Sequence, residues 1–211
     1  MRAVVSFANN PFYQEKMKRL QDSVESQGVT FIGYKSFEEI GSPTHSQVPY
    51  AFKPYAIQKA IDAGVTTLLW CDSPIVAIKD ITPVFEHIER SGYLFFDNIG
   101  HPLGKWTNDK CLKYFGYSRE EAMNIKQIMA CCMGFDFKEA DILVRFQEYK
   151  DLSNELYPGS WDNHRHDQTV MSFIINRSGF MDIENGHETY FIYTHFRQVF
   201  KVADSVCLES K

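Results

Sequence analysis

Residues 65–74 read Val-Thr-Thr-Leu-Leu-Trp-Cys-Asp-Ser-Pro, and this stretch decides the fold. Its central part, from Thr66 to Cys71, is a continuous apolar run without the alternation of a half-exposed strand. Such a run is typical of a strand that is covered on both faces. Asp72-Ser73-Pro74 then breaks the strand. The stretch therefore predicts a buried strand that delivers a carboxylate to one edge of a sheet.

Strands and helices alternate on both sides of this stretch. Ahead of it we expect strands over 3–8 and 29–34 and helices over 12–27 and 53–63, with Met17, Leu20 and Val24 at helical spacing in the first helix. After it we expect helices over 82–91, 138–149 and 167–176, strands over 93–96, 127–135 and 189–193, and a loop over 98–108. This order predicts a single α/β domain, residues 1–211, with a mostly parallel, mixed central sheet and helices on both faces.

The composition excludes several classes of protein. Hydrophobic residues make up 44% and charged residues 23% of the 211 residues, which is ordinary for a globular domain and excludes disorder and coiled coil. The net charge of −5, without a run of Lys or Arg, argues against nucleic-acid binding. No apolar run approaches the roughly 20 residues of a membrane span. Five cysteines without a C-x-x-C pair predict a reducing, cytoplasmic setting.

Two acidic residues are the main candidates for chemistry. Ligands of such sheets bind beyond the carboxyl ends of the strands, where Asp72 is expected. Asp72 is either a ligand of Mg²⁺ or Mn²⁺ or the cap of the next turn. Asp167 opens the helix fixed by the apolar run after it, where a carboxylate is either an ordinary N-cap or is aimed at a ligand. His164 and His166 stand two residues apart just before this helix.

Three weaker signals accompany these carboxylates. Lys53 lies at a helix start, where a cation is unfavourable unless an anion is near, which hints at phosphate. Trp106 stands in a loop with polar neighbours. An indole beside polar groups is typical of a site that holds a sugar ring; the alternative is an ordinary loop with the indole folded inward. His195 follows the last expected strand, and a histidine among aromatic residues is either a packed residue or a ligand.

The motifs, in their order along the chain, resemble those of small nucleotide-sugar glycosyltransferases of the GT-A fold. That family carries a W-K-P-Y-x-I helix start, an aromatic-x-D-[AS] strand end, a W-T-K-R-D-like loop and an H-R-H-D-Q-[ST] helix start. This sequence has, in order, Pro49-Tyr50-Ala51-Phe52-Lys53-Pro54-Tyr55-Ala56-Ile57, Leu68-Leu69-Trp70-Cys71-Asp72-Ser73, Trp106-Thr107-Asn108-Asp109, Gln127-Ile128-Met129-Ala130 and His164-Arg165-His166-Asp167-Gln168-Thr169. The chain looks closest to the glycosyltransferase domains of large chlorella viruses, which build glycans on the capsid protein.

The resemblance implies an activity and a set of site residues. It implies transfer of a hexose or 6-deoxyhexose from a UDP-sugar, such as UDP-glucose, to a hydroxyl of a glycan or glycoprotein, with Mn²⁺ or Mg²⁺. Asp167 would be the catalytic residue, and Asp72 and His195 would hold the metal, because Pro74 replaces the second acid of the usual D-x-D. The nucleotide would contact Ser6, Phe7, Ala8, Lys53, Tyr55, Cys71, Asp72 and Ser73. The sugar would contact Asp97, Trp106, His166 and Gln168.

Two alternatives accompany this interpretation. The missing second acid of D-x-D favours a non-catalytic module of the same fold that binds nucleotides or carbohydrates. A phosphatase-like hydrolase with Asp72 as its nucleophile lacks a second acid two residues on, where Pro74 stands. The sequence does not distinguish inversion from retention at the transferred carbon.

Overall fold

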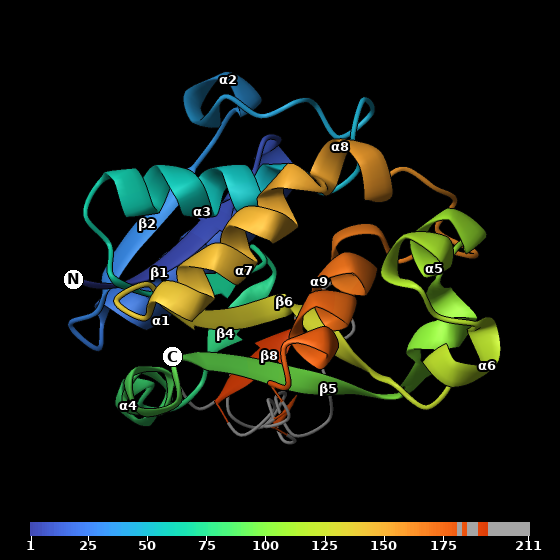
Figure 1. Ribbon diagram of the computed structural model, residues 1–211. Helices are drawn as coiled ribbons and strands as arrows, with labels where there is room; N and C mark the ends of the chain where they lie inside the picture. Colours follow the sequence, from blue (N-terminus) through green and yellow to red (C-terminus); the bar gives the residue numbers. More distant parts are fainter. Residues whose placement is uncertain (181–182, 185–189, 194–211) are drawn as a thin grey trace.

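The structure is a computed structural model that describes residues 1–180, 183–184 and 190–193. Within these ranges six strands form the main sheet, in the order β2-β1-β3-β6-β5-β7 (Figure 1). Only β6 is antiparallel to its neighbours in that sheet, so the mostly parallel, mixed sheet expected from the sequence is confirmed. The strands are β1 (Arg2–Phe7), β2 (Thr30–Tyr34), β3 (Thr67–Cys71), β5 (Tyr93–Pro102), β6 (Lys126–Asp136) and β7 (Ile183–Glu184).

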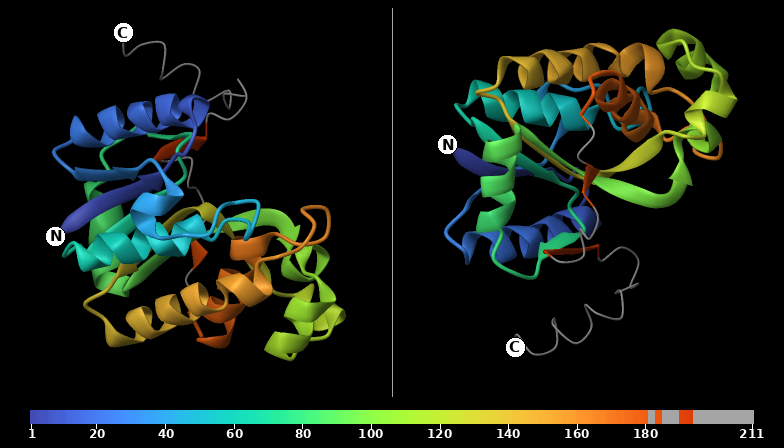
Figure 2. Two further views of the ribbon diagram at one scale, coloured as in Figure 1. Left: turned by 90° about the horizontal axis from the view of Figure 1, so that it is seen from above. Right: turned by 60° about the horizontal axis from the view of Figure 1, so that its bottom comes forward.

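Helices cover both faces of the sheet. On one face lie α3 (Phe52–Asp62), α7 (Ala140–Asp151) and α9 (His166–Arg177), and on the other lie α1 (Pro11–Glu25) and α4 (Thr82–Ser91) (Figures 1 and 2). The strand residues alternate between two apolar cores: Trp70 packs in the core under α3, and Leu69 in the core under α1 and α4. This two-sided burial is the reason that β3 is apolar throughout, since neither of its faces meets water.

Several elements were not predicted from the sequence. They are the short strand β4 (Ile75–Ala77) and the short helices α2 (Phe37–Ile40), η1 (Leu103–Trp106), α5 (Asp109–Phe115), α6 (Arg119–Ala122) and α8 (Ser153–Leu156). The strand expected over 189–193 corresponds to β8 (Phe191–Tyr193), and it pairs with β4 outside the main sheet. The prediction of a loop over 98–108 is wrong in part, because β5 continues through Pro102 and η1 follows it. Register shifts within β5 let the strand carry Gly100 and Pro102.

The parallel pairing of β1 and β3 positions the site. Val5 of β1 lies opposite Trp70 of β3, so the two strands end side by side. Beyond these ends the backbone N–H of Asp72 donates to the carbonyl of Cys131, 2.8 Å away, which brings the middle of β6 to the same edge. Three segments of the sequence therefore meet where ligands bind to sheets of this kind. In the described part of the chain, no helix combines the length and apolar character that a membrane crossing requires.

Candidate active site

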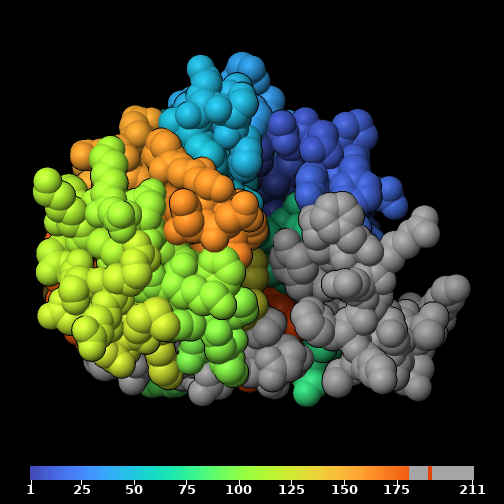
Figure 3. All heavy atoms as spheres, turned by 90° about the vertical axis from the view of Figure 1, so that its right-hand side faces the viewer, coloured from blue at the N-terminus to red at the C-terminus, as the bar shows by residue number. Residues whose placement is uncertain are grey.

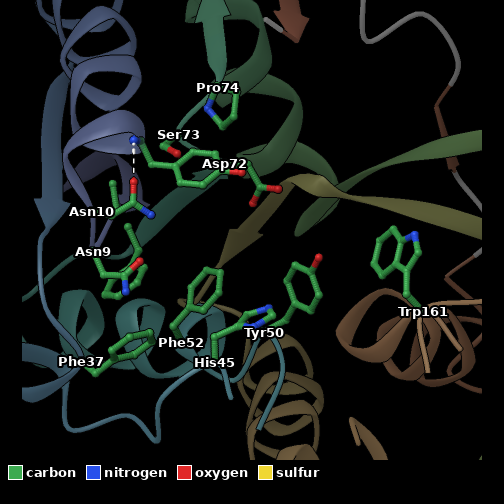
Figure 4. Close-up of a pocket in the computed structure, with 13 residues that line it drawn as sticks. Asn9, Asn10, Phe37, His45, Tyr50, Phe52, Asp72, Ser73, Pro74 and Trp161 are labelled. Carbon is green, nitrogen blue, oxygen red and sulfur yellow. Dashed lines mark hydrogen bonds between the residues drawn. The ribbon is translucent and has the colours of Figure 1, made fainter. Parts of the chain in front are cut away.

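A cavity of about 610 Å³ lies beyond the ends of β1 and β3 (Figure 4). The lining of this cavity is largely aromatic. The amides of Asn9 and Asn10 lie on one side of it, and the carboxylate of Asp72 lies between them and Trp161 on the other side. The lining residues are Phe7, Ala8, Asn9, Asn10, Tyr13, Phe37, His45, Tyr50, Phe52, Asp72, Ser73, Pro74 and Trp161. Such a mixture of apolar surface and a few polar groups is typical of a small-molecule site.

Lys53, Asp72 and Asp167 form a charge centre at this cavity. The Lys53 ammonium lies 3.2 Å from Oδ1 of Asp72 and 3.0 Å from Oδ2 of Asp167, and it donates to the carbonyl of Ala130 at 2.9 Å. Three oxygens therefore surround an ammonium that has three protons to share. Lys53 and Asp167 are both almost completely buried, with 3% of each side chain exposed, whereas Asp72 is 21% exposed and reaches the cavity.

The two ends of the buried ion pair respond differently to burial. Burial alone would lower the pKa of Lys53, but the carboxylates of Asp167 and Asp72 outweigh it and hold this pKa well above its ordinary value. Burial raises the pKa of Asp167, and the nearby Lys53 ammonium opposes that rise. The centre combines one cation with two carboxylates, so it keeps a net negative charge next to the cavity.

The charge centre determines how the site can hold a divalent cation. Oδ1 of Asp72 also accepts a hydrogen bond from Nε1 of Trp70 at 2.8 Å, so this oxygen already has two partners. Oδ2 of Asp72 accepts no hydrogen bond from the described residues, and these residues contain no group of three or more His, Cys, Asp or Glu side chains that could hold a metal ion. They therefore fit a cation that is held mainly by substrate phosphate oxygens, with one carboxylate oxygen from the protein.

Tyr50, Trp161 and His166 pack together at one side of the cavity, and we call them the aromatic wall; Tyr50 and Trp161 line the cavity, and His166 stacks against both of them. The ring of His166 stacks on Tyr50 at 5.3 Å and on Trp161 at 5.7 Å between centroids, and Tyr50 lies 5.8 Å from Trp161. The segment that carries residues 153–165 (orange) lies directly against the cyan segment around residues 40–50 (Figure 3). The wall meets the charge centre, because the Lys53 ammonium lies 5.3 Å from the Tyr50 ring.

The backbone of the aromatic wall is strained. Tyr50 and His166 have φ angles of 61° and 46°, and within the described ranges they are the two residues other than glycine with positive φ. Left-handed backbone costs a residue with a side chain about 1–2 kcal/mol. Such strain is often retained at ligand sites, where the surrounding packing holds it in place. Burial, followed by the charge of Asp167, raises the pKa of Tyr50 to about 12, so its phenol keeps its proton at neutral pH.

The histidine pair of the sequence motif supports the wall. Nε2 of His164 lies 2.7 Å from the carbonyl oxygen of Leu156, and its Nδ1 accepts from the backbone N–H of Asn108. Nδ1 of His166 lies 2.7 Å from the carbonyl oxygen of Tyr157. Burial lowers the pKa of His164 to about 4, so this ring is neutral at physiological pH. His164 is therefore a structural residue that ties the loop before α9 to α8.

The structure brings part of the expected site together. Phe7, Ala8, Asp72 and Ser73 line the cavity, and Asp167 lies behind it in the first turn of α9, as the apolar run predicts. Ser6 and Cys71 are fully buried in β1 and β3, and Tyr55 packs against the core from α3, so none of these three lines the cavity. The anions beside Lys53 are the two carboxylates of its own chain, which replace the phosphate suggested by its place at a helix start.

The expected sugar-binding residues are dispersed. His166 belongs to the aromatic wall, and the amide oxygen of Gln168 accepts from the backbone N–H of Ala130. The Trp106 indole lies against the Arg165 guanidinium, 4.0 Å away, and does not line the cavity. Asp97 pairs with Lys126 at 3.3 Å in a second cavity of about 290 Å³ on β5. His195 lies outside the described residues, so its predicted role as a metal ligand stays a prediction.

Much of the aromatic lining was not predicted from the sequence. Tyr50 stands three residues before Lys53 in the motif Pro49-Tyr50-Ala51-Phe52-Lys53, and yet it was not assigned to the site. Trp161 is the sole aromatic residue in Pro158-Gly159-Ser160-Trp161-Asp162-Asn163, where every neighbour favours a turn. A tryptophan in such a turn segment is not explained by helical or strand packing, and this signal in the sequence could have indicated it.

Comparison with known proteins gives similarity of structure alone. No protein-family model matches the chain, and no curated protein matches it in sequence. Among solved structures it is similar to a glycosyltransferase involved in the glycosylation of the major capsid of PBCV-1, with a TM-score of 0.53 and 15% identity over 83% of this chain and 77% of that chain. It is also similar to the apo form of the bifunctional glycosyltransferase WbbM, with a TM-score of 0.53 and 12% identity over 82% of this chain and 37% of that chain.

These similarities show the fold. The chain has the GT-A architecture, and the resemblance inferred from its motifs is confirmed at that level. The chain corresponds to little more than a third of the length of WbbM, and it covers most of the capsid glycosyltransferase. The charge centre and the aromatic wall therefore lie in a fold that both of these glycosyltransferases share.

Proposed function

We propose that this protein is a glycosyltransferase that moves a sugar from a nucleotide-diphosphate donor to a hydroxyl group of a glycan. The observation that carries the proposal is the charge centre: two carboxylates from distant segments lie together at the ligand-binding edge of a GT-A sheet. Asp72 faces a cavity of about 610 Å³, and Asp167 is buried behind it. That volume lies in the ordinary range of about 300–1,000 Å³ for small-molecule sites.

The two sides of the cavity suit the two halves of a nucleotide sugar. On the β1 side the ring of Phe7 packs 5.1 Å from Phe37 and 4.8 Å from Phe52, which provides apolar surface for a base. The amides of Asn9 and Asn10 lie on the same side (Figure 4). We therefore place the uracil of a UDP-sugar there, its diphosphate near Asp72 and its hexose or 6-deoxyhexose beyond it.

Transfer requires that the bond between the sugar C1 and the diphosphate oxygen breaks through a state that resembles an oxocarbenium ion. When bound, Mn²⁺ or Mg²⁺ would neutralise the departing diphosphate, and Oδ2 of Asp72 is the described ligand that fits it. The carboxylate of Asp167 would stabilise positive charge at C1, or take the proton of the attacking hydroxyl in an inverting reaction. A pKa raised by burial suits the second role, because it makes the carboxylate a stronger base.

The proposed setting is the synthesis of a viral capsid glycan, which the motifs and the similarity to the PBCV-1 capsid glycosyltransferase support. A glycan or glycoprotein would then be the acceptor. A non-catalytic module that binds nucleotides or carbohydrates is the second candidate, because the described residues offer a metal a single carboxylate oxygen.

The test combines ligand binding with turnover. UDP, UDP-glucose, UDP-galactose and UDP-rhamnose are added with and without Mn²⁺, and the melting temperature and the release of UDP from each sugar are measured. A specific donor raises the melting temperature by mass action. We expect Asp72→Asn to remove the metal-dependent part of this shift. We expect it to lower the rate of UDP release roughly 10²–10³-fold, as for other losses of charge stabilisation in a transition state.

Asp62→Asn is the matched control, since Asp62 is an exposed carboxylate on α3 and its loss should change neither quantity. A melting shift without UDP release from any sugar would favour the binding module. Turnover by Asp72→Asn at the wild-type rate would overturn the assignment of Asp72. Release of inorganic phosphate in place of UDP would identify a hydrolase.

A further inference from the structure

Trp161 stands out among the three tryptophans of the chain because half of it is exposed. Its relative exposure is 51%, whereas Trp70 is fully buried and Trp106 is half-buried. Trp161 lies in the turn between α8 and α9 and lines the cavity. An indole is the largest apolar side chain, and leaving so much of it in water forgoes the stabilisation that its burial would bring.

The indole is held in place although it is exposed. Its ring stacks on His166 and lies near Tyr50, and the Arg165 guanidinium lies 4.0 Å from its centroid. The same guanidinium lies 4.0 Å from the centroid of Trp106, and its Nη1 donates to the carbonyl of Trp161. Residues before and after Trp161 in the sequence therefore hold its ring in place, and the rest of its surface is exposed to solvent. A fixed aromatic ring binds a ligand with little further loss of side-chain entropy.

The position of the ring assigns it to one end of the cavity. In Figure 4, Asn9 and Asn10 lie on one side, Asp72 lies in the middle, and Trp161 lies on the opposite side. The β1 side already has its own aromatic surface in Phe7, Phe37 and Phe52. A base bound there leaves Trp161 beyond the diphosphate, on the side toward which the sugar is transferred.

We infer that Trp161 is the stacking platform for a pyranose ring of the acceptor, and that the rest of the aromatic wall serves to hold it. A pyranose presents a face of C–H groups, whose slight positive charge suits the negative face of an indole. This inference rests on the proposed function for the direction of transfer, and the binding of a sugar ring by Trp161 can be tested without it.

The first test is a fluorescence titration that needs no turnover. The protein is titrated with methyl β-glucoside, methyl β-galactoside, methyl β-xyloside and methyl α-rhamnoside, and tryptophan emission is followed. We expect at least one glycoside to shift the emission of the wild type, and we expect Trp161→Phe to remove that shift. Emission that no glycoside changes, or a shift that persists in Trp161→Phe, would overturn the inference.

The second test uses transfer kinetics with the glycoside that binds best. We expect Trp161→Ala to raise the KM for the glycoside roughly five- to tenfold, the size of one lost aromatic contact, with kcat changed far less. Trp161→Phe should recover most of the loss, because it restores a ring. Tyr114→Ala removes another exposed aromatic residue, on α5, and should change neither constant.

The two proposals fail in different ways. An unchanged KM in Trp161→Ala, with the melting shift by UDP-sugars intact, would refute the platform and leave the glycosyltransferase standing. A wild type that neither binds nor cleaves UDP-sugars would refute the glycosyltransferase, and the fluorescence titration would still decide whether Trp161 binds a sugar ring. Melting curves of each variant without ligand show whether it is folded.

Discussion

The charge centre and the aromatic wall border the same cavity, but they are built on opposite principles. In the charge centre each charged group has a partner within 3.2 Å, and two of its three side chains are almost completely buried. In the aromatic wall two of the three residues have left-handed backbone, and the third leaves half of its surface in water. The charge centre is held together by ion pairs within its own chain, whereas the aromatic wall leaves an aromatic surface exposed to a ligand.

This difference suggests a division of labour. A buried carboxylate without a partner would be protonated, so Lys53 keeps the charges where the proposed chemistry needs them. A ligand cannot displace such a centre without uncovering buried charge. Binding at the aromatic wall uncovers no buried charge. A ligand ring that covers the exposed Trp161 indole removes apolar surface from water, which favours binding. The charge centre therefore suits the bond-breaking step, which is the same for every acceptor, and the aromatic wall suits the recognition of a particular acceptor.

The largest expected effect comes from breaking the charge centre. Lys53→Met keeps the length of the side chain but leaves two carboxylates near each other without a cation. Removing one partner of a buried ion pair costs about 3–5 kcal/mol. We therefore expect the free energy of unfolding, measured in urea, to fall by about that amount.

Lys59→Met is the matched control for this change, because Lys59 is exposed on the same helix, α3. It should change stability little. The double variant Lys53→Met/Asp167→Asn should recover part of the loss, since it also removes one of the uncompensated charges. If Lys53→Met were as stable as Lys59→Met, the stabilisation of the charge centre by the Lys53 ion pairs would be refuted.

A smaller loss of stability is expected in acid, where His164, which supports the aromatic wall, takes up a proton when the protein unfolds. Burial lowers the pKa of His164 to about 4, against 6.5 for an ordinary histidine. Between these values the unfolded chain takes up a proton that the folded protein does not, so stability falls as the pH drops from 6.5 to 4. A shift of this size corresponds to about 3 kcal/mol, all of it present above pH 6.5 and lost below pH 4.

His164→Gln should remove this contribution, because glutamine keeps a donor and an acceptor but does not titrate. Urea unfolding at several pH values should therefore show a shallower loss of stability in acid for this variant than for the wild type. His101→Gln removes an exposed histidine and should keep the wild-type slope. Equal slopes in all three proteins would show that His164 does not hold the wall as a neutral ring.

The sequence predicts a region well where regular strands and helices position its residues, and poorly where irregular segments do. Asp72 and Asp167 of the charge centre lie at the ends of regular elements, and the apolar runs beside them fix those ends. Their meeting at one edge of the sheet follows from the topology. The role of Lys53 does not, because its place at a helix start is compatible with phosphate, and only the folded chain shows that two carboxylates reach its ammonium.

The aromatic wall could not be predicted from the sequence in this way. Tyr50 and Trp161 belong to irregular segments, where hydrophobic periodicity carries no information. Tyr50 and His166 also have positive φ, which no local pattern at these residues indicates. The same limit applies to β5, where Gly100 and Pro102 favour a loop, and yet shifts of register let the strand continue.

The smallest expected effect tests the strain of the wall directly. At Tyr50, where φ is 61°, glycine adopts the backbone freely whereas alanine does not. Tyr50→Gly should therefore be more stable than Tyr50→Ala, by about 1 kcal/mol. Tyr55, five residues along in α3, provides the matched pair, since alanine is better than glycine inside a helix by about 1 kcal/mol. Opposite orders at the two tyrosines, measured by urea unfolding, would locate the strain in the backbone of Tyr50. Alanine above glycine at both positions would mean that the wall, like the charge centre, is held without strain, and the contrast between the two regions would rest on exposure alone.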